Sequence, residues 1–170
     1  MSNLLRLTQP DPVDWCEANI QLDYGKFDRA NHPLIVEPLR AAATMRGGMV
    51  GLIGSVQHIK TLLAQLLQLH IAQTAPGRQA HYDLTKEALK EFSDDKFTPL
   101  INNTPAIKDI ILSERFAQTT YYTAMPYGLI RLLSAGILAH RNSKTLEMVS
   151  LDESWAYETG WIDQIKDRLS

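Results

Sequence analysis

Residues 50–61 read VGLIGSVQHIKT, a near match to the phosphate-binding loop G-x-x-x-x-G-K-[ST]. In such a loop, backbone N–H groups and the positive end of the following helix face the phosphates, a lysine bridges two of them, and a hydroxyl binds Mg²⁺. Gly54, Lys60 and Thr61 stand at the required interval, whereas Ile59 replaces the last glycine. From this loop alone, an ordinary strand-to-helix turn is as good an interpretation as a nucleotide site.

The loop has the flanking elements that the motif requires. The apolar run MVGLI, residues 49–53, predicts a short strand buried on both faces. Leucine-rich periodicity predicts a long helix over residues 60–72, and VEPLRAAATMR predicts an earlier helix over residues 36–46 that ends at the following glycines.

The rest of the chain continues the alternation of strands and helices. We expect a strand over residues 80–84, a helix over 85–97 and a short helix over 105–112. A hairpin around Pro126 and Gly128 over residues 117–133, a last strand over 146–153 and a final helix over 161–169 follow. This order predicts an α/β fold, a mainly parallel sheet covered by helices. Residues 1–32 form an N-terminal arm in this interpretation, with Asp14 as the cap of a short amphipathic helix, and residues 33–170 form one core domain.

Composition excludes several classes of protein. The 170 residues are 45% hydrophobic and 21% charged, as in one soluble globular domain. A net charge of −2 gives no global attraction to nucleic acid or anionic lipid. The lone cysteine, Cys16, excludes an internal disulfide, the five histidines lack zinc-ligand spacing, and no run is long enough for a signal peptide or membrane span. We therefore expect a cytoplasmic protein without membrane contact.

A pair of acids follows the last predicted strand. The apolar residues of segment 146–151 lead into Asp152 and Glu153, as in a Walker B motif whose first acid holds magnesium and whose second orients the attacking water. Adjacent acids after an apolar strand are common by chance. Their occurrence after a phosphate-loop match, with an α/β segment between, is much rarer.

With these motifs, the chain resembles the ATPase region of the large terminase subunit of tailed phages, of the lambda-like GpA type. The resemblance runs from about Trp15 to Glu158. It rests on four phrases in the family's order: HPLIVEPLRAAA, SVQHIKT, FTPLINNTPAIKDII and GLIRLLSAGILAHRNSKTLEMVSLDE. It implies a P-loop NTPase-like three-layer sandwich that uses ATP and Mg²⁺ to power DNA packaging into proheads.

The same resemblance assigns roles to single residues and names partners. By this resemblance Lys60 contacts the β- and γ-phosphates, Thr61 and Asp152 bind the magnesium, and Glu153 orients the attacking water. The nucleotide-binding loop is then Gly54, Ser55, Val56, Gln57, His58, Ile59, Lys60 and Thr61. The implied partners are double-stranded DNA within the full motor, a small terminase subunit, a portal protein and a homo-oligomeric ring, in the cytoplasm of a host cell carrying a phage or prophage.

Three departures from the family pattern keep a second interpretation open. A branched Ile59 in a backbone that needs positive φ costs about 1–3 kcal/mol, which corresponds to a loss of nucleotide affinity of about five- to a hundredfold. Residues 54–59 contain no Lys or Arg to stabilise transition-state charge, although Arg46 or Arg78 could substitute. The family's coupling region and nuclease domain have no counterpart in these 170 residues.

The alternative is therefore a truncated, catalytically weak or inactive terminase-like domain that acts through protein–protein interaction. Arg141 and Lys144 are expected in a surface turn more often than on DNA.

Overall fold

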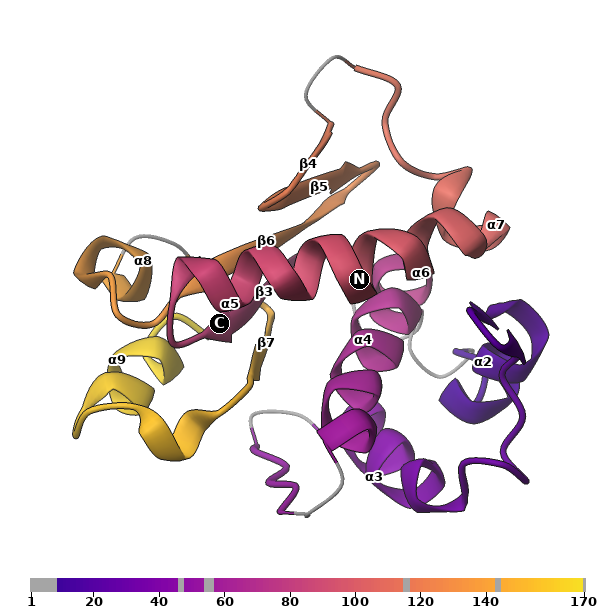
Figure 1. Cartoon of the computed structure of the whole chain (residues 1–170), viewed down its shortest axis with the longest axis horizontal. Coiled ribbons are helices and arrows are strands. Elements are labelled where there is room, and N and C mark those ends of the chain that lie inside the picture. The colour runs from indigo at the N-terminus through magenta and orange to yellow at the C-terminus, as the bar shows by residue number, and fades with distance from the viewer. Residues whose placement is uncertain (1–8, 46–47, 54–56, 115–116, 143–144, 170) are drawn as a thin grey trace. The chain divides into compact units, whose positions relative to one another are not determined.

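A computed structural model describes residues 9–45, 48–53, 57–114, 117–142 and 145–169 (Figure 1). The chain divides into two compact units, Met1–Ala75 with Leu100–Asp109, and Pro76–Pro99 with Ile110–Ser170. The first unit contains α2 (Pro12–Asn19), β1 (Gln21–Leu22), β2 (Gly25–Lys26), α3 (Pro33–Thr44), α4 (Gln57–Thr74) and α7 (Pro105–Lys108). The second contains β3 (Arg78–Asp83), α5 (Lys86–Glu91), the π-helix η1 (Phe92–Phe97), β4 (Gln118–Thr119), β5 (Tyr122–Met125), β6 (Gly128–Ser134), α8 (Leu138–Asn142), β7 (Met148–Leu151), the 3₁₀-helix η2 (Ser154–Ala156) and α9 (Trp161–Lys166). Helix α6 (Thr98–Asn103) runs from one unit into the other.

The first helix begins at a proline and is capped by the aspartate before it. Asp11 Oδ1 accepts hydrogen bonds from the N–H groups of Val13, at 2.9 Å, and Asp14, at 3.1 Å. Pro12 occupies the first helical position, where its fixed φ and missing N–H cost nothing. The prediction that Asp14 caps this helix is wrong, because Asp14 already lies in the first turn.

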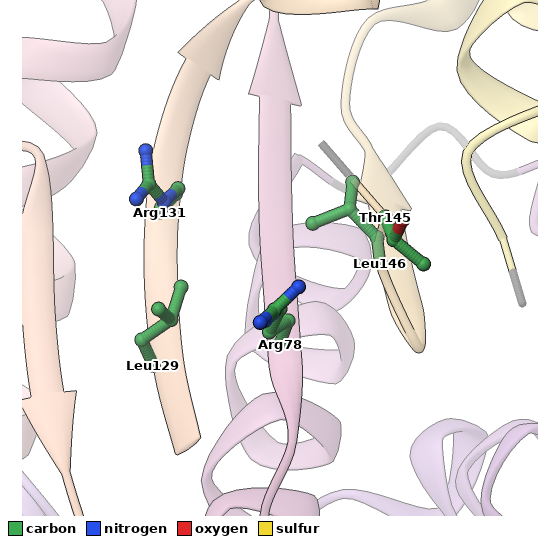
Figure 2. Close-up of a pocket in the computed structure, with 5 residues that line it drawn as sticks. All are labelled: Arg78, Leu129, Arg131, Thr145 and Leu146. Carbon is green, nitrogen blue, oxygen red and sulfur yellow. The ribbon is translucent and has the colours of Figure 1, made fainter. Parts of the chain in front are cut away.

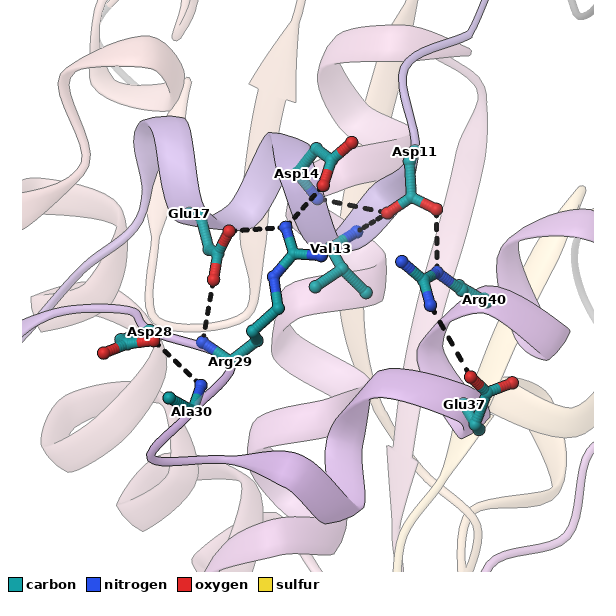
Figure 3. A network of polar contacts seen from close by, with 9 residues as sticks. All are labelled: Asp11, Val13, Asp14, Glu17, Asp28, Arg29, Ala30, Glu37 and Arg40. Atoms are coloured by element: carbon teal, nitrogen blue, oxygen red, sulfur yellow. Dashed lines mark hydrogen bonds and ion pairs between the residues drawn. The ribbon is translucent and has the colours of Figure 1, made fainter.

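Charged side chains join α2 to the segments that follow it in the first unit (Figure 3). The Arg29 guanidinium pairs with both Asp14 and Glu17, and Arg40 on α3 donates to Asp11 at 2.8 Å. Hydrogen bonds from the Arg29 side chain and backbone hold the pKa of Glu17 at about 2, well below its usual value. These contacts tie the capped end of α2 to the neighbouring loop and to α3.

The helices predicted around the loop are confirmed, but the strand before the loop is wrong. Helix α4 covers the predicted residues 60–72 and buries Leu63, Leu66 and Leu69. Helix α3 covers residues 36–44 of the predicted range 36–46 and ends at Thr44, before the glycines. Residues 48–53 form no strand, and the side chains of Met49 and Ile53 are exposed. A short apolar run becomes a buried strand only where a neighbour takes up its backbone hydrogen bonds, and none of the described strands pairs with it.

The sheet of the second unit is mixed, in the order β4-β5-β6-β3-β7. Strand β3 pairs in parallel with β6 and β7, whereas the pairings β4-β5 and β5-β6 are antiparallel. The fold is therefore α/β as predicted, but the prediction of a mainly parallel sheet is wrong. The antiparallel half comes from the predicted hairpin, which is confirmed: Met125 pairs with Gly128 across a two-residue turn of Pro126 and Tyr127.

Side chains of the parallel strands alternate between two faces of the sheet. One face buries Ala80, Tyr82 and Leu133 against Leu146 and Ile165. On the other face, the His81 ring stacks on Phe92 with ring centroids 4.1 Å apart. Among the helices of the described ranges, none is long and apolar enough to cross a membrane.

Candidate functional site

The phosphate-loop residues lead into the first turn of α4 in the first unit. Gly54, Ser55 and Val56 lie outside the described residues, and the backbone is helical from Gln57 onward. Lys60 is half-buried, Thr61 is buried, and no acid occurs in the first turn. The N-terminus of an 18-residue helix with a lysine and no carboxylate is a favourable environment for an anion.

Ile59 has an ordinary helical backbone. It lies inside α4 and is not among the non-glycine residues with positive φ, which are Tyr127 and Glu153 in the described chain. The predicted strain of about 1–3 kcal/mol is therefore wrong for this structure, because a branched side chain is compatible with right-handed helical angles. The remaining reason for Ile59 to weaken nucleotide binding is the bulk of its side chain.

In the second unit, acidic side chains gather where two parallel strands end. Asp83 is the last residue of β3, and Asp152 directly follows β7. The N–H of Asp152 donates to the carbonyl of Tyr82 at 2.9 Å, which extends the ladder by one residue. Because the carboxyl ends of parallel strands meet at one edge of a sheet, Asp83 lies beside Asp152 and Glu153. We call these three residues the acid edge.

The acid edge carries unfavourable electrostatic energy. Burial raises the pKa of Asp83, the N–H of Leu84 opposes this shift, and the charges of Asp152 and Glu153 add to it. Like charges at short range favour protonation or a bound cation. Carboxylate oxygens are the ligands that Mg²⁺ prefers, although within the described residues no three such groups already form a metal cluster.

Glu153 has an unusual backbone and a fixed carboxylate. Its φ of 48° and ψ of 30° are left-handed, a conformation that costs energy in a non-glycine residue and concentrates at functional sites. Its N–H donates to Asp152 Oδ1 at 3.0 Å, and its Oε2 accepts from the indole Nε1 of Trp155 at 2.6 Å. The turn therefore redirects the second acid away from the strand axis, and Trp155 holds it there.

Two buried groups behind the acid edge were not found from the sequence. The Tyr157 hydroxyl is buried and has no hydrogen-bond partner within the described ranges, and burial together with the nearby acids raises its pKa. Burial lowers the pKa of His81 to about 4, and its Nδ1 lies 2.8 Å from the Ser150 hydroxyl.

A signal for Asp83 did exist in the sequence. It lies one residue before the end of the predicted strand 80–84, and the carboxyl ends of neighbouring parallel strands meet at the same edge of a sheet.

The two halves of the predicted site belong to different units. Lys60 and Thr61 are in the first, and Asp152 and Glu153 are in the second. The structure brings the two acids together with Asp83, and the joint site with the loop stays a prediction.

Of the two arginines that could have supplied the missing charge, Arg46 lies outside the described residues and Arg78 does not lie at the acid edge. Arg78 begins β3, five residues before Asp83, or about 17 Å along the strand. It therefore lies at the opposite edge of the same sheet.

Arg141 is part of the core and not of a surface turn. Its side chain is buried, donates to Gln164 at 2.7 Å and to the carbonyl of Ala135, and lies over the Trp161 ring with its Cζ 4.3 Å from the centroid. It is unavailable for DNA, and Lys144 lies outside the described residues.

Comparison with known protein families gives a match that spans most of the chain. The family model described as "Phage terminase large subunit gpA, ATPase domain" matches residues 22–164. No curated protein and no solved structure matches the chain. The matched range includes the loop of residues 54–61, the acid edge and most of each unit.

Proposed function

Because the chain belongs to the family of phage terminase large subunit gpA ATPase domains, we propose that it binds ATP with Mg²⁺ and powers translocation of DNA into proheads. The family implies a terminase ATPase role in phage DNA packaging. The match over residues 22–164 is the observation that carries the proposal, and the geometry of the acid edge supports it.

The residues present suit the proposed ligands. A helix N-terminus with Lys60 and without acids suits the phosphates of ATP, and Lys60 would contact the β- and γ-phosphates. The Thr61 hydroxyl and the Asp152 carboxylate are hard oxygen ligands of the kind that Mg²⁺ takes, and bound Mg²⁺ would neutralise phosphate charge. Glu153 would accept a hydrogen bond from the attacking water and orient it.

The remaining parts of the proposal follow from the family. The fold would be P-loop NTPase-like, with the loop of residues 54–61 around the phosphates. The protein would act in the cytoplasm of the host cell as part of a ring of identical subunits, with double-stranded DNA, a portal protein and a small terminase subunit as partners.

Titration of the purified protein with a fluorescent ATP analogue and magnesium tests the proposal. Lys60→Ala should abolish binding, because the lysine supplies the only side-chain cation in the first turn of α4. Lys108→Ala, on the exposed surface of α7, removes the same charge elsewhere and should leave binding unchanged. Absence of binding by the parent protein at millimolar nucleotide would exclude the ATPase function.

Loss of Glu153 should separate binding from turnover. Glu153→Gln keeps the size of the side chain but cannot accept a proton, so we expect unchanged nucleotide affinity and a 10²- to 10⁴-fold lower rate of ATP hydrolysis (order of magnitude). A variant that hydrolyses ATP at the parent rate would contradict the role of Glu153.

A second candidate function is supported by the loop sequence. Ile59 replaces glycine, and residues 54–59 contain no Lys or Arg. In that case the domain binds no nucleotide and acts by docking on components of the packaging machinery. The same titration decides between the two, since this candidate requires that the parent protein and Lys60→Ala both fail to bind.

A further inference from the structure

Two arginines lie on neighbouring strands of the sheet, Arg78 at the start of β3 and Arg131 in the middle of β6 (Figure 2). Arg78 opens β3, Arg131 lies on β6, and the register pairs Arg78 with Leu129 and Ala80 with Arg131. Residues two apart on a strand face the same side, so both arginines lie on one face of the sheet. With Thr145 they surround an open hollow whose apolar lining is Leu129 and Leu146. We call Arg78, Arg131 and Thr145 the arginine face.

Among the residues that the structure describes, neither guanidinium group has a carboxylate partner. Glu147, whose N–H donates to the Arg78 carbonyl, extends its carboxylate over Gly77 instead: a Cβ added at Gly77 would overlap the Glu147 Oε2 atom. Two unpaired arginines beside a hydroxyl can bind phosphate oxygens through charge-assisted hydrogen bonds.

The arrangement of the arginines favours a polymer over a single phosphate. The Arg131 Cζ lies 5.6 Å from the centroid of the Tyr122 ring on β5, and β5 flanks β6 on the side away from β3. Arg131 therefore leans away from Arg78, and the two cations do not converge on one point (Figure 2). Two separated positive charges suit successive phosphates along a nucleic-acid backbone.

We propose that the arginine face contacts the phosphate backbone of double-stranded DNA. This inference rests on the family assignment but not on ATP binding, because neither arginine belongs to the acid edge or to the loop of residues 54–61. The contact would be independent of base sequence and would hold the duplex while other subunits act on it.

The dependence of DNA affinity on salt tests the contact. Each neutralised phosphate contributes about 0.9 to the magnitude of the slope of log affinity against log salt concentration. The contacts of the two arginines should therefore account for about a twelvefold loss of DNA affinity when salt rises from about 50 to 200 mM. Fluorescence anisotropy with a short labelled duplex, without nucleotide, measures this slope. Arg78→Gln and Arg131→Gln should each reduce it by about 0.9, and Glu147→Gln should increase affinity.

Matched variants separate contact from net charge and from folding. Lys108→Gln makes the same charge change on α7 and should leave the slope unchanged, and Lys60→Ala should bind DNA as the parent does. Arg131→Lys keeps the charge and should keep the slope. A loss in Arg131→Lys equal to that in Arg131→Gln would show that the side chain only packs on Tyr122.

Other results would overturn the proposal. An equal loss of slope in Lys108→Gln would mean that only net charge matters. Equal competition by inorganic phosphate or ATP at the duplex's own phosphate concentration would make this a small-anion site, and binding of single-stranded RNA in preference to the duplex would assign it to another nucleic acid. If the protein binds no ATP but the salt slopes of DNA binding are as expected, the ATPase function is contradicted and the DNA contact of the arginine face is supported.

Discussion

Replacing Ile59 by glycine and, separately, by alanine distinguishes two physical reasons for its effect on nucleotide binding. If the position needs positive φ, only glycine restores affinity, because alanine keeps the Cβ that disfavours that region. If the bulk of the side chain is the obstacle, both variants restore affinity equally. The structure places Ile59 in the helical backbone of α4, so we expect the glycine and alanine variants to bind a fluorescent ATP analogue within about twofold of each other, a difference well under 1 kcal/mol.

The two variants should differ in stability instead. Ile59 is half-buried, so its truncation loses about 1 kcal/mol of burial, half the value for a fully buried side chain. Glycine in a helix costs about 0.5 kcal/mol more than isoleucine, whereas alanine recovers a similar amount. We therefore expect Ile59→Gly to lose about 1.5 kcal/mol of unfolding free energy and Ile59→Ala about 0.5 kcal/mol. In thermal melts this corresponds to shifts of about 3–6 °C and 1–2 °C.

Urea denaturation followed by circular dichroism measures the stability of both variants, and the nucleotide titration measures their affinity. The reasoning is refuted if glycine raises affinity five- to a hundredfold more than alanine, the effect of relieving about 1–3 kcal/mol of strain. A glycine variant more stable than the parent would refute it as well, since both outcomes require positive φ at this position.

Three further predictions concern the acid edge and the first unit. Trp155→Phe removes the indole donor to Glu153 and should lower the rate of ATP hydrolysis about tenfold with KM unchanged, measured by steady-state kinetics. Because burial lowers the pKa of His81 to about 4, its contribution to stability is complete above about pH 6.5 and falls toward pH 4. Urea denaturation should show a loss of about 2 kcal/mol by pH 5 that His81→Phe abolishes. Asp11→Ala removes the cap of α2 and the partner of Arg40, and should lower unfolding free energy by about 1 kcal/mol in the same assay; an unchanged value would exclude the cap.

Local signals predicted the elements better than their pairing. Pro126 and Gly128 placed the hairpin correctly, because a turn depends on the residues that form it. The run of residues 49–53 failed as a strand, because whether an apolar segment becomes a strand depends on a neighbour that the segment does not encode. The prediction of a mainly parallel sheet failed for a related reason, since strand order is a property of the whole sheet.

The candidate site shows the same division. The adjacency of Asp152 and Glu153 after an apolar run was visible in the sequence, and so was the spacing of Lys60 and Thr61. The left-handed turn at Glu153 and the indole contact that holds its carboxylate were not visible, because both depend on the path of the chain after β7. Arg141 had the composition of a surface turn, yet its packing on Trp161 makes it a core residue.

The sequence by itself determined the family and the α/β class, because motif order and periodicity are written along the chain. It also supplied the residues to which the proposed function assigns phosphate and magnesium. Only the tertiary structure decided that Asp83 joins the acid pair, that Ile59 has an unstrained helical backbone, and that Arg78 and Arg131 share one face without a carboxylate partner among the described residues. Each of these depends on strand register or on the start of a helix, which bring together residues that lie far apart in the sequence.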